Sequence, residues 1–381
     1  MKEKDLILGM MPSRERDLNY AFIGFQQTHT SLVGIDDKGS PVFLGAFDDP
    51  GIYYLFPKLA SLLHCNVVLL AQITYLLIII VATSIIWFSF KDKAKSMQQK
   101  ILLYSVCGFL FALNIFKSDV YTFSYLGAAI IPFVIYLLAT KKRYSYMIIF
   151  ILVALSFKLN FFRSHSGTIS LVFFAFYFLF VIREWKTTVA FFASVVLVFI
   201  ANYFITNNIA ENRNKWFTTN TTISIDESLS HPFWHSAYIG LGFIPNSLGL
   251  SYNDQVAMDK VYSMHPGVLF CGKIYESTLK QEYLKILETE TWYFVKVHLV
   301  KIFMVLGLFL FLLNIQIKKL FKLKLSQSLI LPFAASILFA ALSAIIVVPR
   351  INYLNAFITL CFVWFLYLML NNTAVFSAQK K

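Results

Sequence analysis

Two acidic positions beside apolar segments have the chemistry of a general base. Asp48 and Asp49 precede Pro50-Gly51 and an apolar stretch, and Asp119 lies in a short polar link between two apolar segments. A hydroxyl group has a pKa far above 7, so its attack on another molecule needs a carboxylate within hydrogen-bonding distance. Asp48, Asp49 and Asp119 are therefore our candidate catalytic residues. Solvated turn acids remain the alternative, because Asp and Pro-Gly also favour turns.

Basic side chains near the ends of apolar segments are candidates for binding the phosphate of a donor. Arg350 follows Pro349, and a guanidinium can bind a phosphate through two parallel hydrogen bonds. Lys301 and His298 share one face of an apolar helix, at a depth where a cation is costly and often functional. Arg163 completes this set. Lys301 and Arg163 could instead extend to the membrane surface.

Further polar residues are candidates for binding the substrate. His165 lies close to Arg163, Tyr53 follows the acidic pair, and His231 and His235 frame the sequence HPFWH. Helix capping is the alternative for the histidines. The four cysteines lack metal-type spacing, so we predict no metal ligands and no certain cofactor, although a divalent metal stays open. A Cys65–Cys271 disulfide also stays open.

The composition indicates that these residues are positioned by membrane helices. The chain has 381 residues, of which 58% are hydrophobic and 14% charged, whereas a soluble domain has roughly 45–50% and 25%. A span needs roughly 20 mostly apolar residues. The sequence predicts an all-α integral membrane protein of about nine transmembrane helices. The predicted spans are 66–90, 100–116, 121–140, 144–162, 167–182, 187–206, 292–314, 326–348 and 351–370.

Basic residues in the links predict the orientation of the helices. Alternate links, with the C-terminal tail, carry fifteen Lys and Arg against four in the other set, and basic links stay on the cytoplasmic side. This places residues 1–65 outside as an N-terminal loop region, with helices 1–6 at 66–206. An extracytoplasmic, partly helical subdomain follows at 207–291, then helices 7–9 and a cytoplasmic tail at 292–381. No apolar segment precedes residue 65 to carry the first region across. We therefore expect that a leading transmembrane helix is missing, and translocation of an unusual N-terminal tail is the alternative.

The layout resembles the GT-C superfamily of polytopic glycosyltransferases, which use polyprenyl-phosphate sugars on the outer side of the membrane. Its members have an outer loop with an early Asp after the first span, and a second acid between the third and fourth spans. With one leading span missing, Asp48-Asp49 and Asp119 take these positions, and 207–291 takes that of the family's extended outer loop. The element Pro349-Arg350-Ile351-Asn352-Tyr353 is similar to the family's Pro-Arg-Tyr-like motif, with two inserted residues.

The resemblance implies an inverting glycosyltransferase of the cell (inner) membrane. Its partners would be a polyprenyl-phosphate-linked sugar, a glycan or lipid-linked acceptor, and membrane lipids, but not nucleic acid. An Asp would act as the base, and basic groups would stabilise the phosphate as it leaves. Two other classes stay open: an O-antigen polymerase or ligase-like enzyme, and a lipid or solute transporter or flippase.

Overall fold

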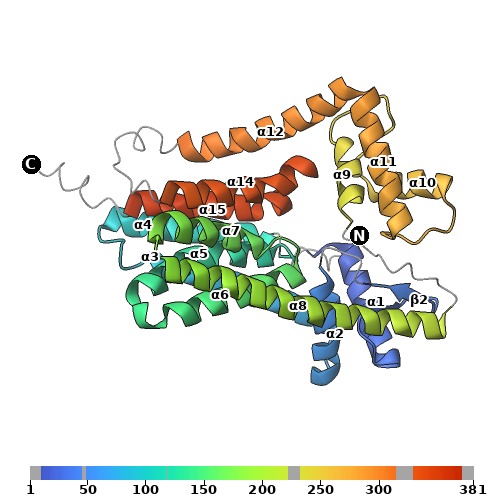
Figure 1. Cartoon of the computed structure of the whole chain (residues 1–381), viewed down its shortest axis with the longest axis horizontal. Coiled ribbons are helices and arrows are strands. Elements are labelled where there is room, and N and C mark those ends of the chain that lie inside the picture. Colours follow the sequence, from blue (N-terminus) through green and yellow to red (C-terminus); the bar gives the residue numbers. More distant parts are fainter. Residues whose placement is uncertain (1–9, 45–48, 117, 222–231, 315–328, 371–381) are drawn as a thin grey trace, which may run out of the picture.

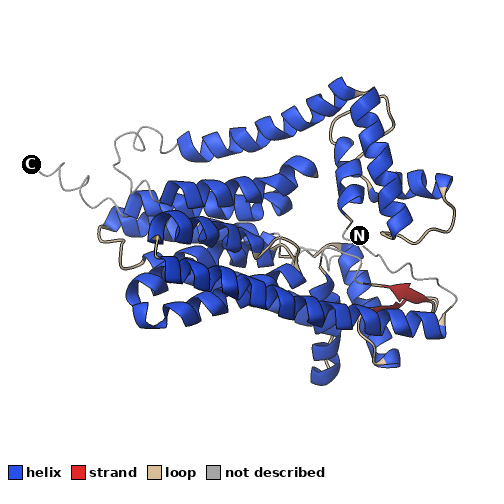
Figure 2. Cartoon of the chain, in the orientation of Figure 1, coloured by secondary structure: helices blue, strands red, loops and turns tan. Residues whose placement is uncertain are grey.

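The structure is a computed structural model that describes residues 10–44, 49–116, 118–221, 232–314 and 329–370. Within these ranges nearly every element is a helix, and the β-structure is one short antiparallel hairpin (Figure 2). The elements are, in chain order, α1 (Pro12–Thr28), β1 (Val33–Ile35), β2 (Pro41–Phe43), α2 (Pro50–Leu63), α3 (Val67–Phe90), α4 (Met97–Phe116), α5 (Thr122–Thr140), the 3-10 turn η2 (Lys142–Tyr144), α6 (Ser145–Phe162), α7 (Thr168–Tyr177), the π-helical turn η3 (Phe178–Ile182), α8 (Trp185–Asn220), α9 (Phe233–Leu241), α10 (Asp254–Met264), α11 (Lys273–Thr289), α12 (Thr291–Asn314), α14 (Ile330–Ile346) and α15 (Ile351–Leu370).

Seven helices of the described chain are long and apolar enough to cross a membrane: α3, α4, α5, α6, α8, α12 and α15. Two apolar helices are shorter, α7 with its continuation η3 and α14. These two pack on each other, where Ser336 Oγ donates to the Ile169 carbonyl at 2.9 Å and the Phe173 and Phe333 rings lie 4.8 Å apart. The fold is thus that of a mainly helical membrane protein. Within the described residues, each of the nine predicted segments contains a helix, and seven of these helices meet the length of a span.

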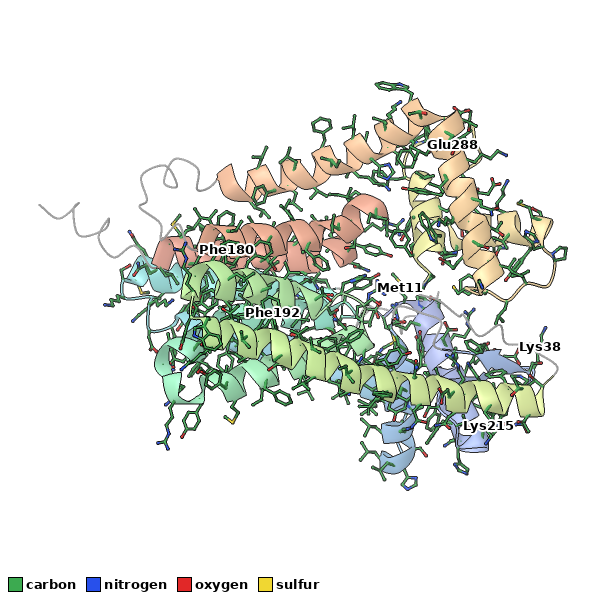
Figure 3. All side chains as sticks on the ribbon, in the orientation of Figure 1. Met11, Lys38, Phe180, Phe192, Lys215 and Glu288 are labelled. Atoms are coloured by element: carbon green, nitrogen blue, oxygen red, sulfur yellow. The ribbon has the colours of Figure 1, made fainter. Side chains whose placement is uncertain are left out.

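The most buried membrane helix is α15, and α8 is the longest. About nine-tenths of the residues in the most apolar stretch of α15 are buried. Helix α15 therefore lies at the centre of the bundle, in contact with α4, α5 and α14. The 36 residues of α8 span about 54 Å. Figure 3 shows Phe192 of α8 beside the other apolar helices and Lys215 at the far end. The boundary predicted at 207 therefore falls inside one continuous helix, because the polar residues after it include no helix breaker.

The region before the first long span is folded. Helix α1 packs against α2 and β1, and α2 begins directly after Asp49. The hairpin turn is held by Asp36, whose Oδ1 accepts the backbone N–H groups of Lys38 and Ser40. Its outer strand meets the end of α8, where Arg213 Nη1 donates to the Leu44 carbonyl at 3.1 Å. The predicted loop region at 1–65 is therefore largely helical within the residues described.

Helices α9, α10 and α11 form a small unit with its own core, which includes Tyr238, Leu241, Val261 and Tyr275. In Figure 1 this unit lies at the same end of the molecule as α1 and the hairpin. We call this end the polar end. Glu288, near the junction of α11 and α12, also lies there (Figure 3). All four cysteines are free, so the disulfide considered above does not form in this structure.

Two glycines allow α5, α6 and the start of α7 to pack closely together. A Cβ on Gly127 of α5 would lie 2.0 Å from the Ser166 carbonyl oxygen. A Cβ on Gly167, which precedes α7, would lie 1.8 Å from the Ser156 carbonyl oxygen of α6. Both distances are far below van der Waals contact. Glycine at these two positions thus places the link between α6 and α7, which carries Arg163 and His165, directly against α5.

Candidate functional site

Arg14, Asp49 and Asp119 form a buried ionic cluster at the polar end. Arg14 Nε donates to Asp49 Oδ2 at 2.8 Å, and Arg14 Nη1 donates to Asp119 Oδ2 at 2.5 Å. The three side chains are 13%, 3% and 2% exposed, respectively. The structure thus brings the two described acids of the predicted catalytic set to one guanidinium. Asp48, the third, lies outside the described residues.

The cluster lies where the N-terminal ends of three helices meet. Asp49 is the N-cap of α2, Asp119 lies three residues before α5, and Arg14 lies in the first turn of α1. The positive end of a helix dipole stabilises a carboxylate and disfavours a cation. Burial raises the pKa of Asp119, although Arg14 and the Val120 N–H oppose it. Burial also opposes the charge of Arg14, but the carboxylates prevail and hold its pKa above the ordinary value.

The two carboxylates differ in the donors they accept. Asp119 uses both oxygens, because Oδ2 binds Arg14 and Oδ1 accepts the Val120 N–H at 2.7 Å. For Asp49, within the part of the chain that the structure describes, the contact is made by Oδ2 with Arg14. A general base needs an oxygen able to accept a proton. Of the two, Asp49 is therefore the better placed to accept one, and Asp119 to hold Arg14.

A cavity of about 280 Å³ opens beside the cluster. It is lined by the start of α5, the link between α6 and α7, and parts of α7, α9, α14 and α15. Tyr121 and Arg163 line the cavity and lie near the cluster. Tyr121 lines the cavity two residues after Asp119, and the Arg163 guanidinium lies 4.7 Å from the Tyr121 ring centroid. The acidic cluster and the cavity are therefore adjacent.

The first turns of four helices lie on the wall of the cavity. Residues from the first turns of α5, α7, α9 and α15, including Ser124, Ser236 and Tyr353, line its wall. Helix N-termini carry partial positive charge and bind phosphate and carboxylate groups. Arg163 adds a full positive charge. His165 also lines the cavity, on a left-handed backbone with φ of 67° that turns the link towards it.

Arg350 is joined to the cavity by three tyrosines. Its guanidinium lies 4.5 Å from the ring centroid of Tyr252, whose hydroxyl lies 3.3 Å from that of Tyr353. The Tyr353 ring packs 5.5 Å from that of Tyr121 on the cavity wall. Arg350 is exposed and lies at the rim of the site rather than inside it. The structure therefore places it on the same side of the bundle as the acids, beyond the tyrosines.

Lys301 and His298 do not line the cavity. Lys301 is fully buried, and its Nζ donates to the Ile346 carbonyl at 3.0 Å. A cation at the last carbonyls of α14 offsets the negative end of the helix, so this contact joins α12 to α14. The His298 ring stacks on Phe294 at 4.4 Å, and its Nε2 lies 3.4 Å from the Tyr283 hydroxyl. These contacts account for both side chains as links between helices.

His235 belongs to a separate polar network inside the α9–α11 unit. Its Nδ1 lies 2.8 Å from the Tyr275 hydroxyl and its Nε2 lies 3.1 Å from Asp254 Oδ1. The hydrogen bond to His235 lowers the pKa of Asp254. His235 thus connects α9 to α10 and α11, instead of facing the cavity. Tyr53 is buried beside the ionic cluster. Burial and the charge of Asp49 raise the pKa of its phenol, and the charge of Arg14 opposes them. His231 lies outside the described residues.

Three residues of the site were not predicted from the sequence: Arg14, and the two asparagines that hold Tyr121, Asn114 and Asn355. Asn355 Nδ2 donates to Asn114 Oδ1 at 2.7 Å and to the Tyr121 carbonyl at 3.3 Å, so two buried amides hold the turn after Asp119. An amide inside an apolar span is a visible signal of this kind. Arg14 also left a signal. It lies two residues after Pro12, a residue typical of a helix start, and a cation there opposes the helix dipole unless an acid faces it.

Comparison with known proteins adds no relative. No protein-family model, curated protein or solved structure matches this chain. In the described residues, no group of three or more His, Cys, Asp or Glu side chains is arranged to hold a metal ion. The functional argument therefore depends on the site itself.

Proposed function

We propose that this chain is a membrane glycosyltransferase that moves a sugar from a polyprenyl-phosphate donor to an acceptor hydroxyl on the extracytoplasmic side. The observation that carries the proposal is the position of the buried pair Asp49 and Asp119 next to a cavity suited to an anion, at the polar end of the helices. One side of the site can accept a proton, and the other can hold a phosphate. Transfer from a lipid phosphate to a hydroxyl requires both.

The roles follow from the contacts. Asp49 removes the proton of the acceptor hydroxyl through its open oxygen, and the acceptor oxygen bonds to the anomeric carbon. The bond from that carbon to the phosphate oxygen breaks, and the electron pair leaves with the phosphate. Arg163 and the helix N-termini around the cavity stabilise this negative charge, with Arg350 at the rim. Attack from the side opposite the phosphate inverts the anomeric configuration.

The adjoining membrane surface supports a lipid-linked donor. The cavity follows α14 from Phe339 to Ile346, which is about 10 Å along the helix. Leu338 and Leu342 of the same helix are exposed, so an apolar surface begins beside the cavity. A lipid chain fits this surface while its phosphate lies in the cavity. A water-soluble nucleotide sugar would gain nothing from it.

The test uses purified protein in lipid nanodiscs with a panel of synthetic polyprenyl-phosphate sugars and candidate acceptors. Release of polyprenyl phosphate and formation of glycosylated acceptor are measured by mass spectrometry. We expect transfer by the parent protein and at least a hundredfold loss in Asp49→Asn, on the scale of general-base catalysis. Asp259→Asn is the matched control, because Asp259 is an exposed acid on α10. Equal transfer by Asp49→Asn and the parent protein would overturn the assigned base, and no transfer with any donor would overturn the proposal.

A further inference from the structure

We infer that Arg14 is the positioning residue of the pair Asp49 and Asp119: it holds the two carboxylates side by side and orients them so that, among the described residues, Asp49 Oδ1 makes no hydrogen bond. The inference deepens the proposed function, on which it rests for the role of Asp49 as base. It also makes a claim about the carboxylates that is measurable without any substrate.

The geometry of the cluster carries the inference. Arg14 uses neighbouring donors, Nε and Nη1, for two different carboxylates instead of binding both oxygens of one. The two Oδ2 atoms are therefore held by two different donors of a single planar group. Two buried carboxylates this close would share a proton without a cation between them. With Arg14 in place, the cluster carries one net negative charge instead of two.

The other groups that face the cluster cannot replace Arg14. The phenols of Tyr53, Tyr75 and Tyr121 lie within range of its charges, and burial favours the neutral form of Tyr53 and Tyr121. Asp17 of α1 adds a further acid, which Arg16 contacts at 3.1 Å. Arg163 acts on Asp119 at longer range. Among the described residues, Arg14 is the cation that contacts both carboxylates.

The shape of the side chain matters as well as its charge. The guanidinium is a rigid fork of donors, whereas the ammonium of lysine is a single point of charge. Lysine at position 14 would keep the carboxylates ionised without fixing both Oδ2 atoms on one rigid group. Arg14→Lys and Arg14→Met therefore separate the two parts of the inference, since methionine removes the charge and keeps most of the length.

The first experiment measures protonation. Infrared spectra of each protein in nanodiscs are titrated with pH, and the carbonyl band of protonated carboxylic acids is assigned by subtracting spectra of Asp49→Asn and Asp119→Asn. In Arg14→Met we expect protonation of the pair to begin about 1 to 3 pH units higher than in the parent protein, since an adjacent cation lowers a carboxyl pKa by that amount. Arg14→Lys should stay near the parent value. Arg16→Met is the control from the same helix, and an Arg14→Met titration unchanged from the parent protein would overturn the inference.

Catalysis gives the second readout. In the transfer assay, we expect the acid limb of the pH profile of kcat to shift about 1 to 3 pH units higher in Arg14→Met, with little change in KM. Arg14→Lys should keep the pH profile and show a lower kcat. If the infrared titration shifts as expected while even the parent protein transfers no sugar, the inference about Arg14 holds and the proposed function fails.

A third variant covers loss of folding. If Arg14→Met alone does not yield monodisperse protein, Arg14→Met combined with Asp119→Asn should do so, because a single buried carboxylate needs no cation to separate it from another. Recovery in the double variant supports the electrostatic role. A double variant that also fails to fold would show that Arg14 acts through packing, which overturns the inference.

Discussion

Replacing Gly167 by alanine would force apart the helices that carry the candidate anion site. The new Cβ would lie 1.8 Å from the Ser156 carbonyl oxygen and within 2.6 Å of Ser156 Cα, which are backbone atoms of α6. The backbone of Gly167 itself is ordinary, with φ of −88°, so alanine has no conformational strain there. The whole effect of the substitution is therefore steric.

The size of the effect follows from these distances. Reaching ordinary contact at about 3.4 Å requires the helices to separate by roughly 1.6 Å, because no flexible side chain can move aside. Overpacking of a tight core usually costs about 1–3 kcal/mol. For a domain of more than 150 residues, each kcal/mol lowers Tm by about 2–4 °C, so we expect a loss of about 2–12 °C.

The assay heats purified variants in detergent micelles and measures the monodisperse fraction by size-exclusion chromatography. Gly307→Ala is the matched control, because a Cβ at that helical position meets no atom within 4 Å. Alanine favours a helix by up to about 1 kcal/mol over glycine, so the control should be unchanged or slightly more stable. Equal melting of Gly167→Ala and Gly307→Ala would refute the close approach of α6 and the α6–α7 link.

Two further predictions concern the polar end. Tyr275→Phe removes the hydroxyl bonded to His235 Nδ1 and should weaken the α9–α11 unit by about 1–3 kcal/mol, seen as faster hydrogen exchange in α9 and α10 with α15 unchanged; unchanged exchange in α9 would contradict the network. Once the four native cysteines are replaced by alanine, a cysteine at Asn220 should react with an impermeant maleimide applied to intact cells, whereas one at Lys95 should not; the reverse pattern would invert the proposed orientation.

Apolar length and composition were sufficient to locate the membrane helices, because a span must satisfy its own backbone hydrogen bonds within one apolar stretch. The ends of the helices were harder to predict from the sequence. Helix α8 continues to Asn220, since its polar second half packs Arg213 and Phe217 against the hairpin, and those contacts depend on residues some 170 positions earlier.

The candidate site shows the same limit. Asp49 and Asp119 were recognised from their type and from their positions beside apolar segments. Arg14 was not, because its unusual place near a helix start indicates that an acid faces it but does not say which, and the two acids lie 35 and 105 positions away. Lys301 was recognised as unusual at its depth, but its partner is a backbone carbonyl of α14, and a carbonyl leaves no mark in a sequence.

The continuous helix α8 is mechanically a lever with one arm in lipid. In the C-terminal half of α8, Arg213 donates a hydrogen bond to the carbonyl of Leu44, and Leu44 lies five residues before Asp49. Over about 54 Å, a tilt of one degree moves the far end by about 1 Å. Transmembrane helices tilt to match the thickness of the surrounding bilayer. A thinner or thicker membrane is therefore expected to shift the contact between Arg213 and the Leu44 carbonyl, at the edge of the region that carries Arg14.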